Sequence, residues 1–170
     1  MMMSEKLSRP QLVITRTFNA PREHVFQACT EAEHLKHWWG PEGAALHVVE
    51  FDCRPGGVFR YYTETEEGVM WVKLVYQEIA APDRLVFVNS FSDEEGKLIR
   101  APFWPEYPLE IRNEFTFTEE GGRTTLTMTS APVNAGPEDL AFFASVIPDV
   151  EEGFGGTFER LALYVEKLRE

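Results

Sequence analysis

Two asparagines lie where strand alternation would bury them among apolar side chains. Asn113 lies in LEIRNEFTF, residues 109–117, on the face that carries the leucine, isoleucine and phenylalanine side chains. Asn89 lies between two phenylalanines on one face of RLVFVNSF, residues 84–91. Because a buried amide without a partner costs roughly 1–3 kcal/mol, each must bond to backbone, water or a ligand. Either the two amides form hydrogen bonds to a ligand inside an aromatic pocket, or they are structural and bond to neighbouring backbone.

The segment HWWGPEG, residues 37–43, puts two tryptophans directly before a glycine and a proline, where neither a helix nor a strand readily continues. Side chains of neighbouring residues in an extended segment point in opposite directions. We therefore expect one of Trp38 and Trp39 to lie in the core and the other at the rim, so that the pair flanks the mouth of an internal cavity.

Motifs of catalysis are sparse. The sequence has no Gly-x-Ser-x-Gly elbow, no phosphate-binding loop and no His-Glu-x-x-His helix. His34 and His37, beside Glu33, offer two metal ligands without an identifiable third, so we predict a solvated helix face there and no metal. Asp52 and Arg54 are expected to pair across a turn. No cofactor is indicated, and nothing singles out an enzyme.

Composition limits the classes of protein that fit. The chain has 170 residues, 44% of them hydrophobic, which suits one domain with a single core. The formal net charge of -12 argues against a nucleic-acid partner, because phosphate backbones bind clustered Lys and Arg. No apolar run approaches the roughly 20 residues that cross a bilayer, and the N-terminus lacks the apolar core of a secretion signal. We therefore expect a cytoplasmic protein without a membrane partner, with Cys29 and Cys53 unpaired.

Hydrophobic periodicity predicts the first elements. Residues 1–10 are expected to be a flexible tail, and residues 11–170 form the domain. Alternation in QLVITRTF, residues 11–18, predicts a strand. Pro21 suits the first turn of a helix that ends near Thr30. A capping box of Thr30 and Glu33 would open a second short helix that runs to the tryptophan pair.

Six further strand-like segments between residues 45 and 130 are separated by turns and predict an antiparallel meander. In one separator, RPGG, Pro55 and Gly56 fit the central positions of a type II turn. A final helix begins at residue 137 and runs to the C-terminus, with Pro148 expected to kink or interrupt it. The predicted fold class is α+β: a curved antiparallel sheet of about seven strands around a long C-terminal helix, with an internal hydrophobic cavity.

The connection SDEEGKLIRAPFWPEYP, residues 92–108, is long and rich in proline and aromatic residues. Long connections are commonly binding loops, so this one is either a lid over the cavity or a loop that covers the sheet edge. Gly153, Gly155 and Gly156 each cost helix stability. They indicate a need for close approach or for room and would shape the cavity wall beside Phe154, or they act as a hinge.

Four stretches resemble a known family: TRTFNAPREHVFQACTEAEHLKHWWGPEG, FDCRPGGVFR, YQEIAAPDRLVF and EEGFGGTFERLALYVEKL. They are similar to the bacterial proteins related to the C-terminal domain of the activator of the ninety-kilodalton heat-shock chaperone's ATPase. That family belongs to the START-like, helix-grip superfamily, which also contains the major birch pollen allergen and polyketide cyclases. The resemblance runs from about Leu12 to Leu168 and implies a sheet gripping the C-terminal helix around a hydrophobic pocket. Members bind small apolar molecules, assist chaperones, or have no known activity.

The candidate ligand-binding residues are the two asparagines and the aromatic side chains expected around the cavity, although core packing is the alternative for each ring. They are Trp38, Trp39, Phe59, Tyr61, Trp71, Phe87, Asn89, Phe91, Phe103, Trp104, Asn113, Phe115, Phe154 and Phe158.

Three functions follow as hypotheses. The first is non-catalytic binding of a small hydrophobic or aromatic molecule in the cavity. The second is a chaperone-associated role in the stress response, implied by the resemblance alone. The third is a cyclase or hydrolase acting on an aromatic substrate, with Asn113 in contact with it. Either a monomer or a homodimer is compatible with the sequence.

Overall fold

The computed structural model describes residues 10–40, 43–66 and 68–169. Nearly all of the predicted flexible tail, residues 1–9, lies outside the described residues. Among the described residues, no helix combines the length and apolar character that crossing a bilayer requires.

The described residues form one antiparallel sheet of eight strands, whose order is β1-β8-β7-β5-β4-β3-β2 with β6 paired to β5. In chain order the strands are β1 (Leu12–Phe18), β2 (Ala45–Phe51), β3 (Val58–Thr65), β4 (Gly68–Ala80), β5 (Arg84–Ser92), β6 (Leu98–Ile99), β7 (Glu110–Glu120) and β8 (Arg123–Val133). The sequence predicted about seven strands. The additional one, β6, is a two-residue strand inside the long connection 92–108.

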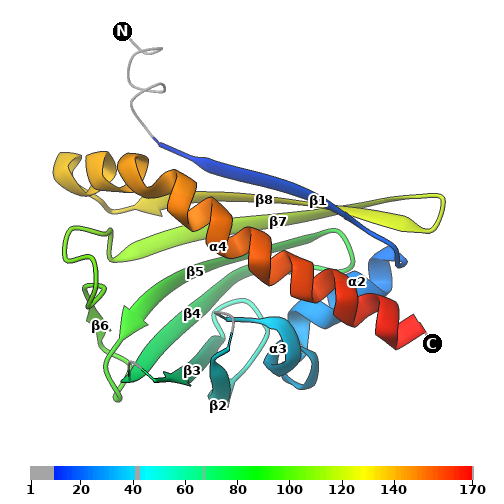
Figure 1. Ribbon diagram of the computed structural model, residues 1–170, viewed down its shortest axis with the longest axis horizontal. Coiled ribbons are helices and arrows are strands. Elements are labelled where there is room, and N and C mark those ends of the chain that lie inside the picture. The colour runs from blue at the N-terminus through cyan, green and yellow to red at the C-terminus, as the bar shows by residue number, and fades with distance from the viewer. Residues whose placement is uncertain (1–9, 41–42, 67, 170) are drawn as a thin grey trace, which may run out of the picture.

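Three helices lie on one face of this sheet (Figure 1). The two short ones, α2 (Arg22–Thr30) and α3 (Ala32–Trp38), lie beside the C-terminal half of the long helix α4 (Pro137–Arg169). Alternate side chains of the strands point toward the helices, as the pattern of buried and half-buried residues along β7 shows. The α+β, helix-grip-like arrangement predicted from the sequence is confirmed.

The core lies between α4 and the sheet. Phe158, Leu161 and Val165 of α4 are fully buried, at helical spacing. Phe158 packs edge-on against Phe115 of β7 with ring centroids 6.0 Å apart. The apolar stripe of the helix therefore covers the apolar face of the sheet.

The turn before β3 has the predicted geometry. Gly56 has a φ of +84°, which the second central position of a type II turn requires. The Gly57 amide donates to the Arg54 carbonyl at 2.7 Å and closes the turn. The Arg54 side chain pairs with Asp52 at 2.8 Å, as predicted.

The predicted capping box of α3 is absent, and the predicted interruption of the last helix at Pro148 does not occur. The N-cap of α3 is Glu31 and carries no side-chain capping bond, while the Thr30 hydroxyl donates to the Phe26 carbonyl instead of forming a capping box. Helix α4 also continues through Pro148 without interruption. Pro148 is exposed, so the Ala144 carbonyl that lacks its usual amide partner lies on the outer side of the helix.

Candidate functional site

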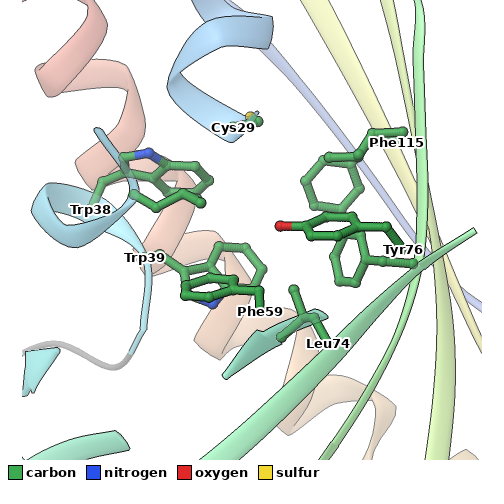
Figure 2. Close-up of a pocket in the computed structure, with 10 residues that line it drawn as sticks. Cys29, Trp38, Trp39, Phe59, Leu74, Tyr76 and Phe115 are labelled. Carbon is green, nitrogen blue, oxygen red and sulfur yellow. The ribbon is translucent and has the colours of Figure 1, made fainter. Parts of the chain in front are cut away.

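A small cavity of about 10 Å³ lies between the α2–α3 pair and the middle of the sheet (Figure 2). Its volume matches that of one water molecule. The lining is almost entirely apolar and consists of Cys29, Leu35, Trp38, Trp39, Phe59, Leu74, Tyr76, Leu85, Phe87 and Phe115. The structure thus brings five of the predicted site residues to one cavity: Trp38, Trp39, Phe59, Phe87 and Phe115.

The tryptophan pair divides as the sequence predicts. Trp38 is 1% exposed, and its indole N–H donates to the Ala28 carbonyl at 2.8 Å, which ties α3 to α2. Trp39 is half-buried just beyond the end of α3, and its indole N–H donates to the Tyr61 hydroxyl at 2.9 Å. The two rings meet edge to face with centroids 5.4 Å apart. Trp39 therefore forms the outer side of the cavity.

The segment that carries Trp39 is held to α4 through the carbonyl of the next residue. The Arg160 guanidinium donates to the Gly40 carbonyl oxygen, and the Thr157 hydroxyl lies 3.4 Å from the same atom. Gly40 has a φ of +99°, a conformation that favours glycine. Residues 41 and 42, which belong to the predicted cavity mouth, lie outside the described residues.

Tyr76 and two cysteines supply the polar atoms of the cavity region. In Figure 2 the Tyr76 hydroxyl points into the space between the tryptophans and Phe115. Burial raises the pKa of this hydroxyl above its usual range, and the neighbouring Cys53 thiol adds to the shift. Burial also raises the pKa of the Cys53 thiol to about 11 and, more strongly, the pKa of Cys29. All three groups are therefore neutral at physiological pH.

The two asparagines bond to each other. The Asn113 amide nitrogen donates to the Asn89 side-chain oxygen at 2.7 Å and to the Ile111 carbonyl at 3.2 Å. The Ser130 hydroxyl donates to the Asn113 side-chain oxygen. Asn113 is 2% exposed and has both its donor and its acceptor groups engaged, whereas Asn89 is half-buried. The partners of Asn113 are mainly side chains, whereas the sequence left open backbone, water or a ligand.

The long connection 92–108 does not line the interior cavity. Phe103 packs edge-on against Phe91 at 5.4 Å, and Trp104 packs against Phe142 of α4 at 5.7 Å. Arg100 pairs with Asp139 in the first turn of α4 at 3.0 Å. The connection therefore covers the ends of β5 and α4, away from the cavity.

The other predicted site residues surround the cavity or lie apart from it. Tyr61 is buried behind Trp39. Phe154 and Phe158 pack against the two tryptophans from α4, at 6.1 Å from Trp39 and 6.5 Å from Trp38. Trp71 lies on the opposite face of β4 from Leu74 and Tyr76, which line the cavity, and packs 4.8 Å from Tyr62.

Glycines in α4 do not shape the cavity. A methyl group added at Gly153 or Gly155 would meet nothing within 4 Å, and one added at Gly156 would touch only the Arg160 side chain at 3.9 Å. The prediction of close approach at these positions is therefore wrong.

The helix face with His34 and His37 is partly covered by α4. His34 Nδ1 lies 2.6 Å from the Tyr164 hydroxyl, and the His37 ring stacks on Tyr164 with centroids 5.2 Å apart. Within the described part of the chain, no group of three or more His, Cys, Asp or Glu side chains has an arrangement that could hold a metal ion.

Five cavity-lining residues escaped the sequence analysis: Cys29, Leu35, Leu74, Tyr76 and Leu85. Helical periodicity contains a signal for Cys29 and Leu35, since both lie on the buried faces of α2 and α3. In β4 both faces contain apolar residues, so alternation alone could not tell Leu74 and Tyr76 from their outward neighbours.

The chain is similar to solved structures of bacterial proteins. Protein Ms6760 from Mycobacterium smegmatis is 26% identical over 90% of this chain and 88% of its own, with a TM-score of 0.73. A protein from Arthrobacter aurescens is 22% identical over 92% of this chain and 86% of its own, with a TM-score of 0.78. A protein from Staphylococcus epidermidis is 24% identical over 95% of this chain and 93% of its own, with a TM-score of 0.76.

A search among curated protein sequences gave no match. The family model described as "Activator of Hsp90 ATPase homolog 1-like protein" matches residues 19–166, which include every element of the cavity wall. The chain therefore belongs to the family of proteins like activator of Hsp90 ATPase homolog 1.

Proposed function

We propose that this protein binds a small, neutral, hydrophobic or aromatic molecule between the tryptophan pair and the sheet, without catalysing a reaction on it. The observation that carries the proposal is the cavity: ten side chains from helices and strands converge on one point in the core and leave a gap there. Five large aromatic rings and a tyrosine hydroxyl border this gap, and a mainly apolar lining with few polar groups is typical of ligand pockets.

Binding must enlarge this gap, because about 10 Å³ holds one water and no metabolite. Trp39 is the side chain best placed to move. It is half-buried, it follows the end of α3, and a single indole hydrogen bond to Tyr61 holds its polar edge. Outward rotation of Trp39 would open the cavity while Trp38 stays fixed by the Ala28 carbonyl.

The lining selects for neutral ligands. None of the ten lining residues is acidic or basic. A charge carried into such surroundings without a partner costs several kcal/mol. Tyr76 and the thiol of Cys29 offer weak polar contacts instead, which suits an aromatic molecule with at most one neutral polar group.

The test is thermal unfolding with naphthol, naphthoate and naphthylmethylamine, which share one ring system and differ in charge. Naphthol at a hundred times its dissociation constant should stabilise the native state by about 2.7 kcal/mol, and the two charged compounds should have little effect. Trp39→Ala should bind naphthol more tightly than the wild type, because no indole ring then has to rotate outward before the ligand enters the cavity.

Leu74→Phe fills the cavity from β4 and should abolish the shift. Val13→Phe, a similar enlargement at a residue that is 49% exposed, serves as its matched control and should leave the shift unchanged. If neither the wild type nor Trp39→Ala shows a saturable shift with any of the three compounds, the proposal fails.

The family description favours a second candidate, association with an Hsp90-type chaperone. In this case the purified protein should raise the ATPase rate of the Hsp90 from its own organism. Leu74→Phe should not affect that increase, because Leu74 is 3% exposed and cannot contact a partner protein. An unchanged ATPase rate at saturating protein would remove this candidate.

A further inference from the structure

A groove of about 390 Å³ opens at the surface where β4 begins and β5 ends. It shares no lining residue with the interior cavity. Tyr62 of β3 and Trp71 of β4 line it, together with Ile99 and Pro102 of the long connection. Val69, which is 55% exposed, lies at its rim. The volume falls in the range of roughly 300–1,000 Å³ that small-molecule pockets occupy.

Strand register explains why the groove exists. His47, Tyr62, Trp71 and Ser92 are direct neighbours across β2, β3, β4 and β5, and so share one face of the sheet. The first three stack in sequence, with ring centroids 4.6 Å apart between His47 and Tyr62 and 4.8 Å apart between Tyr62 and Trp71. Ser92 is small and buried, so the row of rings stops at Trp71. Ile99 pairs with Phe91, whose side chain lies on the other face of β5 from Ser92, so the groove lies at the end of the sheet, where the start of β4 meets the long connection.

The polar end of the groove is acidic. Asp93 and Glu94 line it, and none of the described lining residues is basic. One oxygen of the Asp93 carboxylate accepts from the amides of Glu95 and Lys97, both at 2.9 Å, which fixes this carboxylate in the turn.

Lys97 is part of this turn, and two cations from neighbouring strands hold the backbone of the turn rather than its carboxylates. Arg60 donates to the Glu94 carbonyl oxygen at 2.9 Å and pairs with Glu50, and Lys73 donates to the Gly96 carbonyl oxygen at 3.3 Å. The groove therefore combines aromatic rings and aliphatic walls with two carboxylates at one end. Aromatic rings beside carboxylates favour a ligand whose positive charge is attached to an apolar body.

We propose that this groove is a binding site for an organic ammonium ion with an apolar body, distinct from the interior cavity. The body lies against Trp71 and the apolar residues of the lining, and the ammonium group lies at the Asp93–Glu94 end.

The test uses phenylbutylamine, phenylbutanol and phenylbutyrate, which share a body and differ in charge. Binding is followed by the NMR signals of the four tryptophan indole N–H groups, each assigned with a Trp→Phe variant. The amine should shift the Trp71 signal in a saturable manner and leave Trp38 and Trp39 unchanged. It should bind about tenfold more tightly than the alcohol, as a cation–π contact and a nearby carboxylate predict, and the acid should not bind.

Two pairs of variants locate the site. Trp71→Leu should weaken the amine by about tenfold, measured by calorimetry, whereas Trp104→Leu, a change outside the groove, should not. Glu94→Gln should reduce the preference for the amine over the alcohol, whereas Glu95→Gln, the same charge change at an exposed residue in the same turn, should preserve it. The unchanged Trp38 signal reports that each variant is folded.

Three outcomes would overturn the proposal. One is a Trp71 signal that stays unmoved at millimolar amine, and another is equal binding of the amine and the alcohol with no effect of Glu94→Gln. A shift of Trp38 and Trp39 instead of Trp71 would place the amine in the interior cavity. None of these results bears on the naphthol experiment, so the two proposals can fail separately.

Discussion

Asn113 illustrates how much one buried side chain can contribute to this fold. It is 2% exposed, and Asn89, Ser130 and the Ile111 carbonyl engage its amide. Asn113→Ala leaves these partners without their bonds, so we expect the free energy of unfolding to fall by about 1–3 kcal/mol. Chemical denaturation measures the change.

Asn89→Ala provides the comparison. Asn89 is half-buried and shares one bond with Asn113, so its loss should cost less than the loss of Asn113. If Asn113→Ala unfolds at the same denaturant concentration as the wild type, the network contributes nothing measurable to stability.

For single residues, the sequence predicted whether a side chain is buried better than it predicted that side chain's hydrogen-bond partners. Strand alternation placed Asn113 inside, and the breaker after Trp39 separated the two tryptophans correctly. Alternation was not decisive in β4, because the outward face also contains large apolar residues, Val69, Trp71 and Val75. Which face turns inward there depends on pairing with β3 and β5, and a single segment does not contain that information.

The helices raise a different question, namely why α4 contains three glycines. Gly153 and Gly155 have open space where a side chain would begin. Gly153→Ala and Gly155→Ala should therefore each raise the free energy of unfolding by roughly 0.5–1 kcal/mol, because alanine lowers the entropy cost of forming a helix. Thermal or urea unfolding would detect both changes.

Gly57→Ala is the opposite case and serves as a control. A methyl group at Gly57 would lie 2.0 Å from the Asp52 carbonyl oxygen, which is backbone and cannot move aside cheaply. This variant should be strongly destabilised. Destabilisation by the helix variants as well would mean that the glycines have a packing role that the open space does not reveal.

Among the elements, periodicity predicted every strand longer than two residues and all three helices. Periodicity missed two details, namely the hydrogen-bond partner of the Thr30 hydroxyl and the continuity of α4 at Pro148. The Thr30 hydroxyl had two possible partners, the start of α3 and the Phe26 carbonyl of its own helix, and the second is four residues away in a turn already formed. The exposed position of Pro148 made a continuous helix tolerable, and exposure depends on the fold as a whole.

The whole molecule should lose stability in alkali. Burial raises the pKa of Cys53 from 9.0 to about 11 and that of Tyr107 from 10.0 to about 12, and it raises the pKa values of Cys29, Tyr61 and Tyr76 as well. In the unfolded chain these groups lose protons at their ordinary, lower pKa values. The stability that they contribute is therefore complete below about pH 9 and declines as pH rises toward about 11 and beyond.

Urea denaturation between pH 7 and pH 11 measures this decline. Cys53→Ser, at a half-buried site, should reduce the slope with pH, since serine does not ionise in this range. A denaturation midpoint that stays constant up to pH 11 would contradict the expectation.

The overall architecture was predictable because its signals are distributed along most of the chain, as the family match over residues 19–166 also shows. The size of the interior cavity was not. The cavity is the space left unfilled between ten side chains, which come from six helices and strands and from Trp39 just after α3. No local sequence pattern determines the volume of such a space.

Strand order also has a consequence for how the chain folds during synthesis. The strands from β2 to β5 pair with near neighbours in the sequence, and β7 pairs with β8 across a two-residue turn. The first strand, in contrast, pairs only with β8, so that Leu12 lies opposite Ser130. A ribosome must therefore deliver nearly the whole sheet before β1 finds its partner, and α4 arrives later still. Until then the aromatic residues that α4 covers, such as Phe115, remain exposed, which favours aggregation of the growing chain.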